Sequence, residues 1–124
     1  MAVIKRVLCP EQLRRVPEQF SWIDHRLVRD RHIAGRSAEA LALYLFLVTV
    51  ADGQGLSYYA DTTIGKLLPL DGAALTRARQ ELVRARLIAY EKPLYQVLSL
   101  DKPAPRSGQV ESLGQILRQM ECSR

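Results

Sequence analysis

Residues 62–88 read TTIGKLLPLDGAALTRARQELVRARLI, which is the most informative stretch of the chain. Apolar residues recur at helical spacing on both sides of Pro69, which predicts two helices joined by a tight turn. In the second helix Leu75, Ala78 and Leu82 share one face, because positions three and four apart lie together on an α-helix, and we expect that face to be buried. The opposite face carries one small residue and then polar or basic residues, namely Ala73, Arg77, Gln80 and Arg84.

A helix of this kind is suited to binding double-stranded DNA. Small residues at its N-terminal end let it approach base edges in a major groove, and arginines further along can hold phosphates. We therefore predict that the helix over residues 72–84 contacts DNA. Asp71 is expected to cap this helix rather than to touch DNA, because phosphates repel a carboxylate.

Caps and turns predict the elements that come earlier in the chain. Ser37 is a good N-cap for a helix over residues 38–51, which ends in an apolar run. That helix is apolar on nearly all sides, so we expect other elements to cover most of its faces. Residues 52–55 (DGQG) predict a turn in which both glycines are free to adopt positive φ, and residues 56–58 predict a very short strand.

The remaining elements complete the expected fold. Asp61 is expected to cap a helix over residues 62–68. Alternating residues at 87–90 and 95–100 predict two strands, with a turn between them at 91–94. The sequence therefore predicts a mostly α fold with a small β-hairpin.

This order of elements resembles a winged helix-turn-helix domain, with the hairpin as the wing. Such domains show a small residue in the helix before the turn, an apolar residue in the turn, a capping residue, and apolar and small residues through the second helix up to a closing Leu-Ile pair. The matching positions here are Gly65, Leu70, Asp71, Leu75, Ala78, Leu82, Ala85, Arg86, Leu87 and Ile88.

The longer pattern, over about residues 20–100, is similar to the N-terminal domains of plasmid replication initiators and DnaD-like primosomal proteins. Transcriptional repressors share most of it. The resemblance implies a bacterial protein that binds double-stranded DNA as a homodimer. It leaves three roles open, which are replication initiation, mobile-element function and transcription regulation.

Two positions depart from the pattern of winged helix-turn-helix domains. Pro69 stands where Gly is common, so the first helix is expected to stop sharply. Arg86 stands where Gly usually takes the left-handed conformation that ends the second helix. A residue other than Gly costs on the order of 1 kcal/mol in that conformation, or the helix ends by another route.

The candidate DNA-binding residues come from three predicted elements. The start of the first helix crosses the DNA backbone in this architecture, the second helix enters the groove, and a lysine in the hairpin turn reaches the backbone. The full set is Thr62, Thr63, Lys66, Ala73, Ala74, Thr76, Arg77, Gln80, Arg84 and Lys92. Arg79 lies on the same side of the helix as Leu75, so we expect it either to extend over the edge of the domain or to touch DNA.

Composition agrees with one folded domain and an anionic partner. The chain has 124 residues, 48% of them hydrophobic, and a formal charge of +5. Most of the excess positive charge lies within residues 5–36 and 72–88. The expected organisation is a basic arm (1–19), the winged-helix domain (20–100), a linker (101–109) and a short amphipathic helix (110–124).

The predicted C-terminal helix carries an apolar stripe, formed by Val110, Leu113, Ile116, Leu117 and Met120. A helix this short is marginal alone, so we expect it to dock on this chain or on another.

Cysteine content and hydropathy indicate a cytoplasmic protein. Cys9 and Cys122 are too few for a disulfide framework, although a bond between them is the alternative to the reduced state. We see no signal peptide, and the apolar run at residues 38–51 is too short to span a bilayer.

Catalysis is not expected. His25 and His32 lack the Cys or second carboxylate that would complete a metal site. Gly53 and Gly55 lack the following Lys-Ser/Thr of a phosphate loop. Four tyrosines are expected to pack within the strands rather than to stack on single-stranded nucleic acid, namely Tyr58, Tyr59, Tyr90 and Tyr95. We predict no cofactor and no metal.

The alternative to DNA binding is a winged helix that serves as a protein-interaction module. Its support is the apolar segment Phe20–Val28 and the C-terminal stripe, either of which could bind a protein partner. Salt dependence separates the two functions, since binding to phosphates weakens steeply with salt.

Overall fold

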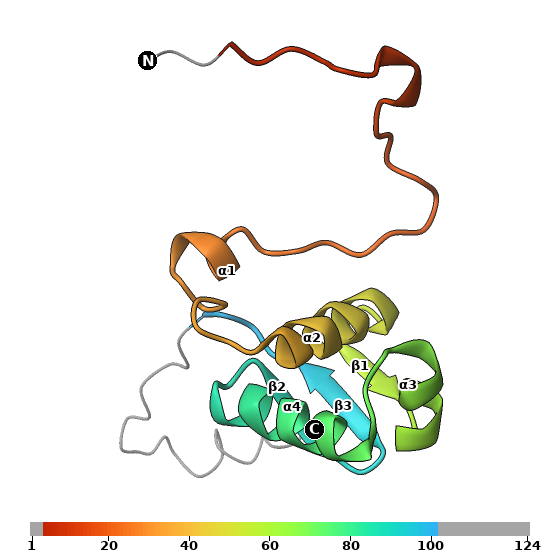
Figure 1. Cartoon of the computed structure of the whole chain (residues 1–124), viewed down its shortest axis with the longest axis vertical. Helices are drawn as coiled ribbons and strands as arrows, with labels where there is room; N and C mark the ends of the chain where they lie inside the picture. The colour runs from red at the N-terminus through yellow and green to blue at the C-terminus, as the bar shows by residue number, and fades with distance from the viewer. Residues whose placement is uncertain (1–3, 102–124) are drawn as a thin grey trace, which may run out of the picture.

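The computed structural model of this protein describes residues 4–101. Helices predominate, and three short strands form one antiparallel sheet (Figure 1). The elements in chain order are the 3-10 helix η1 (Pro10–Gln12), α1 (Arg26–Arg29), α2 (Ala38–Val50), β1 (Leu56–Tyr58), α3 (Asp61–Leu67), α4 (Gly72–Arg84), β2 (Ile88–Glu91) and β3 (Leu94–Val97). Within the described range, no helix has the length and apolar character needed to cross a membrane.

The sheet joins the predicted hairpin to the predicted short strand. Its strand order is β1-β3-β2, with β3 in the centre and both neighbours antiparallel to it. Tyr95 of β3 therefore lies opposite Ser57 of β1 on one side and Tyr90 of β2 on the other. The strand β3 ends at Val97 rather than at the predicted Leu100.

The turn before β1 depends on one of its two glycines. Gly55 has a φ of +86°, and a Cβ atom there would lie 2.6 Å from the carbonyl oxygen of Val97. The backbone amide of Val97 donates to the Gly55 carbonyl, which brings the two strands together. Only glycine accommodates both the positive φ and the close approach. Gly53 does not have a positive φ.

The core lies between α2, α4 and the sheet. The helices α2 and α4 pack against each other, and the predicted apolar face of α4 is buried. The buried core residues are Leu27, Ala40, Leu43, Tyr44, Leu47, Ile64, Leu70, Ala74, Leu75, Ala78, Leu82, Leu87, Ile88 and Tyr95. Burial of this apolar surface is the main favourable contribution to folding.

Both ends of α4 follow from local sequence. The Asp71 carboxylate accepts a 2.7 Å hydrogen bond from the amide of Ala74, which confirms the predicted N-cap. At the other end Arg86 has a φ of 62°, the left-handed conformation usually taken by Gly. The amide of Leu87 then donates to the carbonyl of Leu82, so the helix closes as Gly-capped helices do.

The cap of α3 differs from the prediction, whereas the covering of α2 agrees with it. Asp61 is the first residue of α3 rather than its cap; Ala60 holds the cap position without a side-chain hydrogen bond. The apolar helix α2 is covered on most of its faces, as expected, although the Leu45 side chain is 55% exposed. One stripe of α2 therefore faces away from the domain.

The segment before α2 docks on the core through few side chains. Leu27 is buried, and the Ser21 hydroxyl donates a hydrogen bond to the Thr49 carbonyl. Phe20, Trp22 and Val28 are instead at least 65% exposed, so most of the apolar segment Phe20–Val28 lies on the surface. The chain before it extends away from the domain (Figure 1). The predicted linker from residue 102 onward and the predicted helix at 110–124 lie outside the described residues.

Candidate nucleic-acid interface

The outer face of α4 carries the predicted contact residues. Ala73, Arg77, Gln80 and Arg84 are all exposed, and Thr76 beside them is half-buried. They follow one another along the side of α4 opposite Leu75 and Leu82, whose side chains are fully buried. The face is therefore available to a ligand along the whole length of the helix.

One edge of α4 is fastened to α3 and to the sheet by Arg79. The Arg79 Nη1 atom lies 2.9 Å from Asp61 Oδ1 and donates a second bond of 2.9 Å to the Tyr95 hydroxyl. The guanidinium carbon also lies 4.4 Å from the centre of the Tyr90 ring, a cation–π contact. With only 12% of its side chain exposed, Arg79 extends over the edge of the domain, where these contacts hold it.

Burial and these contacts act in opposite directions on the charge of Arg79. Desolvation by itself lowers the pKa of the guanidinium, but the hydrogen bonds to Asp61 and Tyr95 outweigh it and raise that pKa. The hydroxyl of Tyr95 has a raised pKa, first because it is buried. The cluster therefore holds a permanently charged guanidinium against a neutral phenol and a carboxylate.

The other edge of α4 is fastened to the start of α2 by Glu81. The Glu81 carboxylate accepts a 2.7 Å bond from the Ser37 hydroxyl and a 2.9 Å bond from the Ser37 amide. The same hydroxyl accepts from the amide of Ala40 and so caps α2, as predicted. The two bonds from Ser37 lower the pKa of Glu81, because they stabilise its charged form.

These contacts give α4 a fixed orientation. Arg79 and Glu81 lie on opposite flanks of the helix, and the buried leucines hold the side between them. The remaining side is the exposed face of Arg77 and Arg84. A helix held on three sides presents its fourth side with little freedom to rotate, as recognition of a rigid duplex requires.

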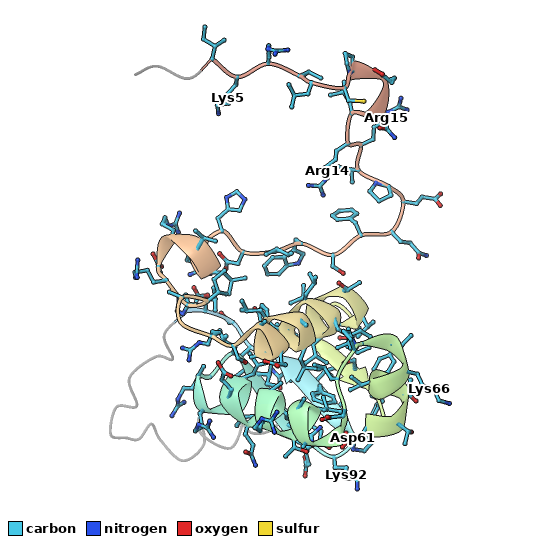
Figure 2. All side chains as sticks on the ribbon, viewed as in Figure 1. Lys5, Arg14, Arg15, Asp61, Lys66 and Lys92 are labelled. Atoms are coloured by element: carbon cyan, nitrogen blue, oxygen red, sulfur yellow. The ribbon has the colours of Figure 1, made fainter. Side chains whose placement is uncertain are left out.

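The predicted contact residues of α3 and the hairpin turn are also exposed. They are Thr62, Thr63, Lys66 and Lys92. A hollow of about 260 Å³ lies between the start of α3 and the turn, and Thr62 and Lys92 both line it. Figure 2 shows Lys66 and Lys92 projecting outward from these two elements. Two elements far apart in sequence thus place hydroxyl and ammonium groups around one depression.

One member of the predicted set does not belong to the surface. Ala74 is buried and forms part of the core, although its neighbour Ala73 is exposed. Successive residues of a helix point about 100° apart, so one of two adjacent alanines turns inward. Helical spacing already separates the two alanines, because Ala74 lies four and eight residues before the buried Ala78 and Leu82.

The fastening contacts of α4 were missed by sequence reasoning. Asp61 and Arg79 are 18 residues apart, and Ser37 and Glu81 are 44 residues apart. No local spacing predicts such pairs. The only sequence signal was the placement of Arg79 on the flank next to Leu75, which predicted a position at the domain edge.

Among residues 4–101, no group of three or more His, Cys, Asp or Glu side chains is placed to hold a metal ion. Comparison of the chain with protein-family models, curated proteins and solved structures gave no match.

Proposed function

We propose that this protein is a winged helix-turn-helix protein that binds double-stranded DNA. In this proposal α4 enters a major groove, and α3 and the β2–β3 turn lie against the flanking phosphates. The observation that carries it is the exposed face of α4, with Arg77, Gln80 and Arg84 presented on a helix whose other sides are fastened. Lys66 and Lys92 on the adjoining elements add positive charge.

The order of elements supports the winged-helix part of the proposal. Along the chain, α2 is followed by the short strand β1 and then by α3 and α4, which are joined by a tight turn. The two-stranded hairpin β2–β3 comes next. The β2–β3 turn lies close to the start of α3, since Lys92 and Pro93 line one hollow with Thr62. A wing in that position lies beside the recognition helix.

Each side chain has a definite task in this proposal. Arg77 and Arg84 bind phosphates, or Arg77 reads guanine through its two-pronged guanidinium. Gln80 pairs with adenine or holds the backbone, and Ala73 allows close approach at the start of the helix. Replication initiation, mobile-element function and transcription regulation all require such binding, and two copies would read a symmetric site.

The deciding experiment is fluorescence-anisotropy binding to a labelled random duplex across a salt series. Wild type should bind with an affinity that falls steeply as salt rises, and Arg77→Ala/Arg84→Ala should weaken binding and reduce the salt slope by about 2, one for each lost phosphate contact. The matched control is Arg29→Ala/Arg31→Ala, which removes the same charge from α1 and the turn after it. In Figure 1, α1 and α4 lie on opposite sides of α2. Equal losses in the two double variants would overturn the assignment of α4.

The second candidate function is a protein-interaction module, and one observation favours it. Phe20, Trp22 and Ile23 are exposed by 65%, 76% and 52%, an unusual concentration of large apolar side chains in one short segment. Binding to DNA that is absent or insensitive to salt, and equal in wild type and Arg77→Ala/Arg84→Ala, would favour this function.

A further inference from the structure

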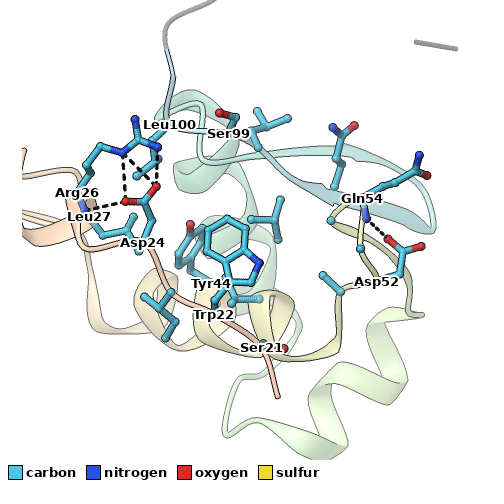
Figure 3. Close-up of a pocket in the computed structure, with 18 of the residues that line it drawn as sticks. Ser21, Trp22, Asp24, Arg26, Leu27, Tyr44, Asp52, Gln54, Ser99 and Leu100 are labelled. Atoms are coloured by element: carbon cyan, nitrogen blue, oxygen red, sulfur yellow. Dashed lines mark hydrogen bonds and ion pairs between the residues drawn. The ribbon is translucent and has the colours of Figure 1, made fainter. Parts of the chain in front are cut away.

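A groove of about 430 Å³ lies on a part of the molecule that the DNA-binding proposal does not use (Figure 3). Its walls are the segment Ser21–Leu27, the C-terminal half of α2, the turn at residues 52–55, and the chain from Gln96 to Asp101. None of the candidate DNA-binding residues lines it. The groove therefore requires a separate explanation.

The groove combines an apolar floor with an acidic rim. Trp22, Leu27, Tyr44, Val48, Leu98 and Leu100 provide its largest apolar side chains. Three carboxylates line the groove, those of Asp24, Asp52 and Asp101, together with one guanidinium, that of Arg26. Trp22 is 76% exposed even though it lines the groove, so a large aromatic surface is left uncovered.

An ion pair fixes the end of the described chain at the rim of this groove. Arg26 Nη1 lies 2.6 Å from Asp101 Oδ1, and Arg26 Nη2 lies 2.7 Å from Asp24 Oδ2. The hydrogen bonds from Arg26 lower the pKa of Asp24 to about 2, so this carboxylate stays charged at neutral pH. The described chain therefore ends beside the groove.

We infer that the groove is the docking site for the chain's own C-terminal segment, residues 110–120. The apolar stripe of this segment could cover the apolar side chains that the floor of the groove leaves exposed. Residues 102–124 hold four Lys or Arg against two Glu, which complements the acidic rim. The eight intervening residues, 102–109, can span at most about 29 Å when extended. That length is sufficient for the segment to reach the groove, because Asp101 lies at its rim.

The tether favours this segment over a second copy of the chain. A tether of eight residues holds the segment at an effective concentration on the order of millimolar, which a separate molecule rarely reaches. The docked stripe would cover Trp22 and the apolar side chains around Tyr44. The exposed apolar side chains around Trp22, which favour a protein partner, would then be covered by the same chain.

Trp22 makes the inference testable, because it is the one tryptophan of the chain and lies at the groove. Its acrylamide quenching is measured in full-length wild type, in Leu117→Asp, and in the matched control Gln115→Asp, which adds the same charge on the opposite face of the predicted helix. We expect weak quenching in wild type and Gln115→Asp, several-fold stronger quenching in Leu117→Asp, and no change with protein concentration.

Three outcomes would overturn the inference. Wild type could be quenched as strongly as free N-acetyltryptophanamide, or Leu117→Asp could be quenched as weakly as wild type. Protection that grows with protein concentration would identify a second copy as the occupant. Thermal unfolding of each variant shows that it is folded, and Val110→Asp, at the far end of the stripe, replaces Leu117→Asp if that variant unfolds. The readout does not involve DNA, so failure of the DNA-binding proposal leaves it unaffected.

Discussion

Arg77 and Arg79 stand two residues apart on α4 and have opposite surroundings. Arg79 lies on the flank that faces α3 and the sheet, where Asp61, Tyr95 and Tyr90 surround its guanidinium. Arg77 lies on the outer face and is exposed. Arginine therefore serves two purposes in α4. Arg79 holds the helix in place, and Arg77 belongs to the exposed face. The predictions below test that division through the free energy of unfolding.

The largest effect is expected on the buried side. Leu75 is 1% exposed, and Leu75→Ala should lower the free energy of unfolding by roughly 2–5 kcal/mol, because it removes buried methyl groups and leaves a cavity. Val83→Ala is the control on the same helix, since Val83 is 40% exposed. Urea denaturation measures both. A negligible loss in Leu75→Ala would show that the buried face is misassigned.

The next effect is expected at the fastened flank. Arg79→Ala should cost about 1.5–3 kcal/mol, because it removes charge-assisted hydrogen bonds and leaves the largely buried Tyr95 hydroxyl without its partner. Arg77→Ala is the matched control and should change stability by no more than ~0.5 kcal/mol. Equal losses from the two substitutions, measured by urea denaturation, would remove the distinction between the flank and the face.

A smaller effect with a pH signature is expected at Glu81. Glu81→Gln should cost on the order of 1 kcal/mol at pH 7, because it weakens the two bonds from Ser37. The pKa of Glu81 is lower in the folded chain than its ordinary value of 4.5. Its charged form thus contributes stability above about pH 4.5, and that contribution is lost as the pH falls through the folded pKa.

Unfolding of wild type and Glu81→Gln at a series of pH values from 7 to 3 measures this effect. The difference between the two proteins should shrink as the pH falls below 4.5. Glu91→Gln, at an exposed position of β2, is the control. A difference that stays constant over the whole range would contradict the pairing of Glu81 with Ser37.

The smallest effect on stability is expected at the outer face. Arg77→Ala/Arg84→Ala should shift the free energy of unfolding by no more than ~0.5 kcal/mol for each substitution, as exposed changes usually do. The same double variant should give the largest loss of DNA affinity. A large loss of stability would mean that the outer face also holds the fold, and the affinity loss would then say nothing about DNA contact.

Local sequence signals predicted most elements because their causes are local. Ser37 and Asp71 cap α2 and α4 as expected, and the spacing of Leu75, Ala78 and Leu82 gave the buried face. Arg86 adopts the left-handed conformation that its position in the pattern suggested. These features depend on residues within a turn or two of one another, so the sequence contains all that is needed to predict them.

Predictions failed where a side chain had a choice of partners. Asp61 stands where a helix cap is common, but its carboxylate pairs with Arg79, which is placed beside it by the packing of α3 on α4. The segment Phe20–Val28 is rich in apolar residues, but Leu27 alone among them is buried. Hydropathy says that a residue can be buried, not that a partner surface exists.

The sequence by itself determined the order of helices and strands, the two capped helices, and the basic outer face of α4. The packed fold was needed to show which side chains fasten α4 and where the chain leaves an apolar groove beside Asp101. The physical reason is distance along the chain. Caps and periodicity act over a few residues, whereas the pairs Asp61–Arg79 and Ser37–Glu81 exist only after the helices have packed.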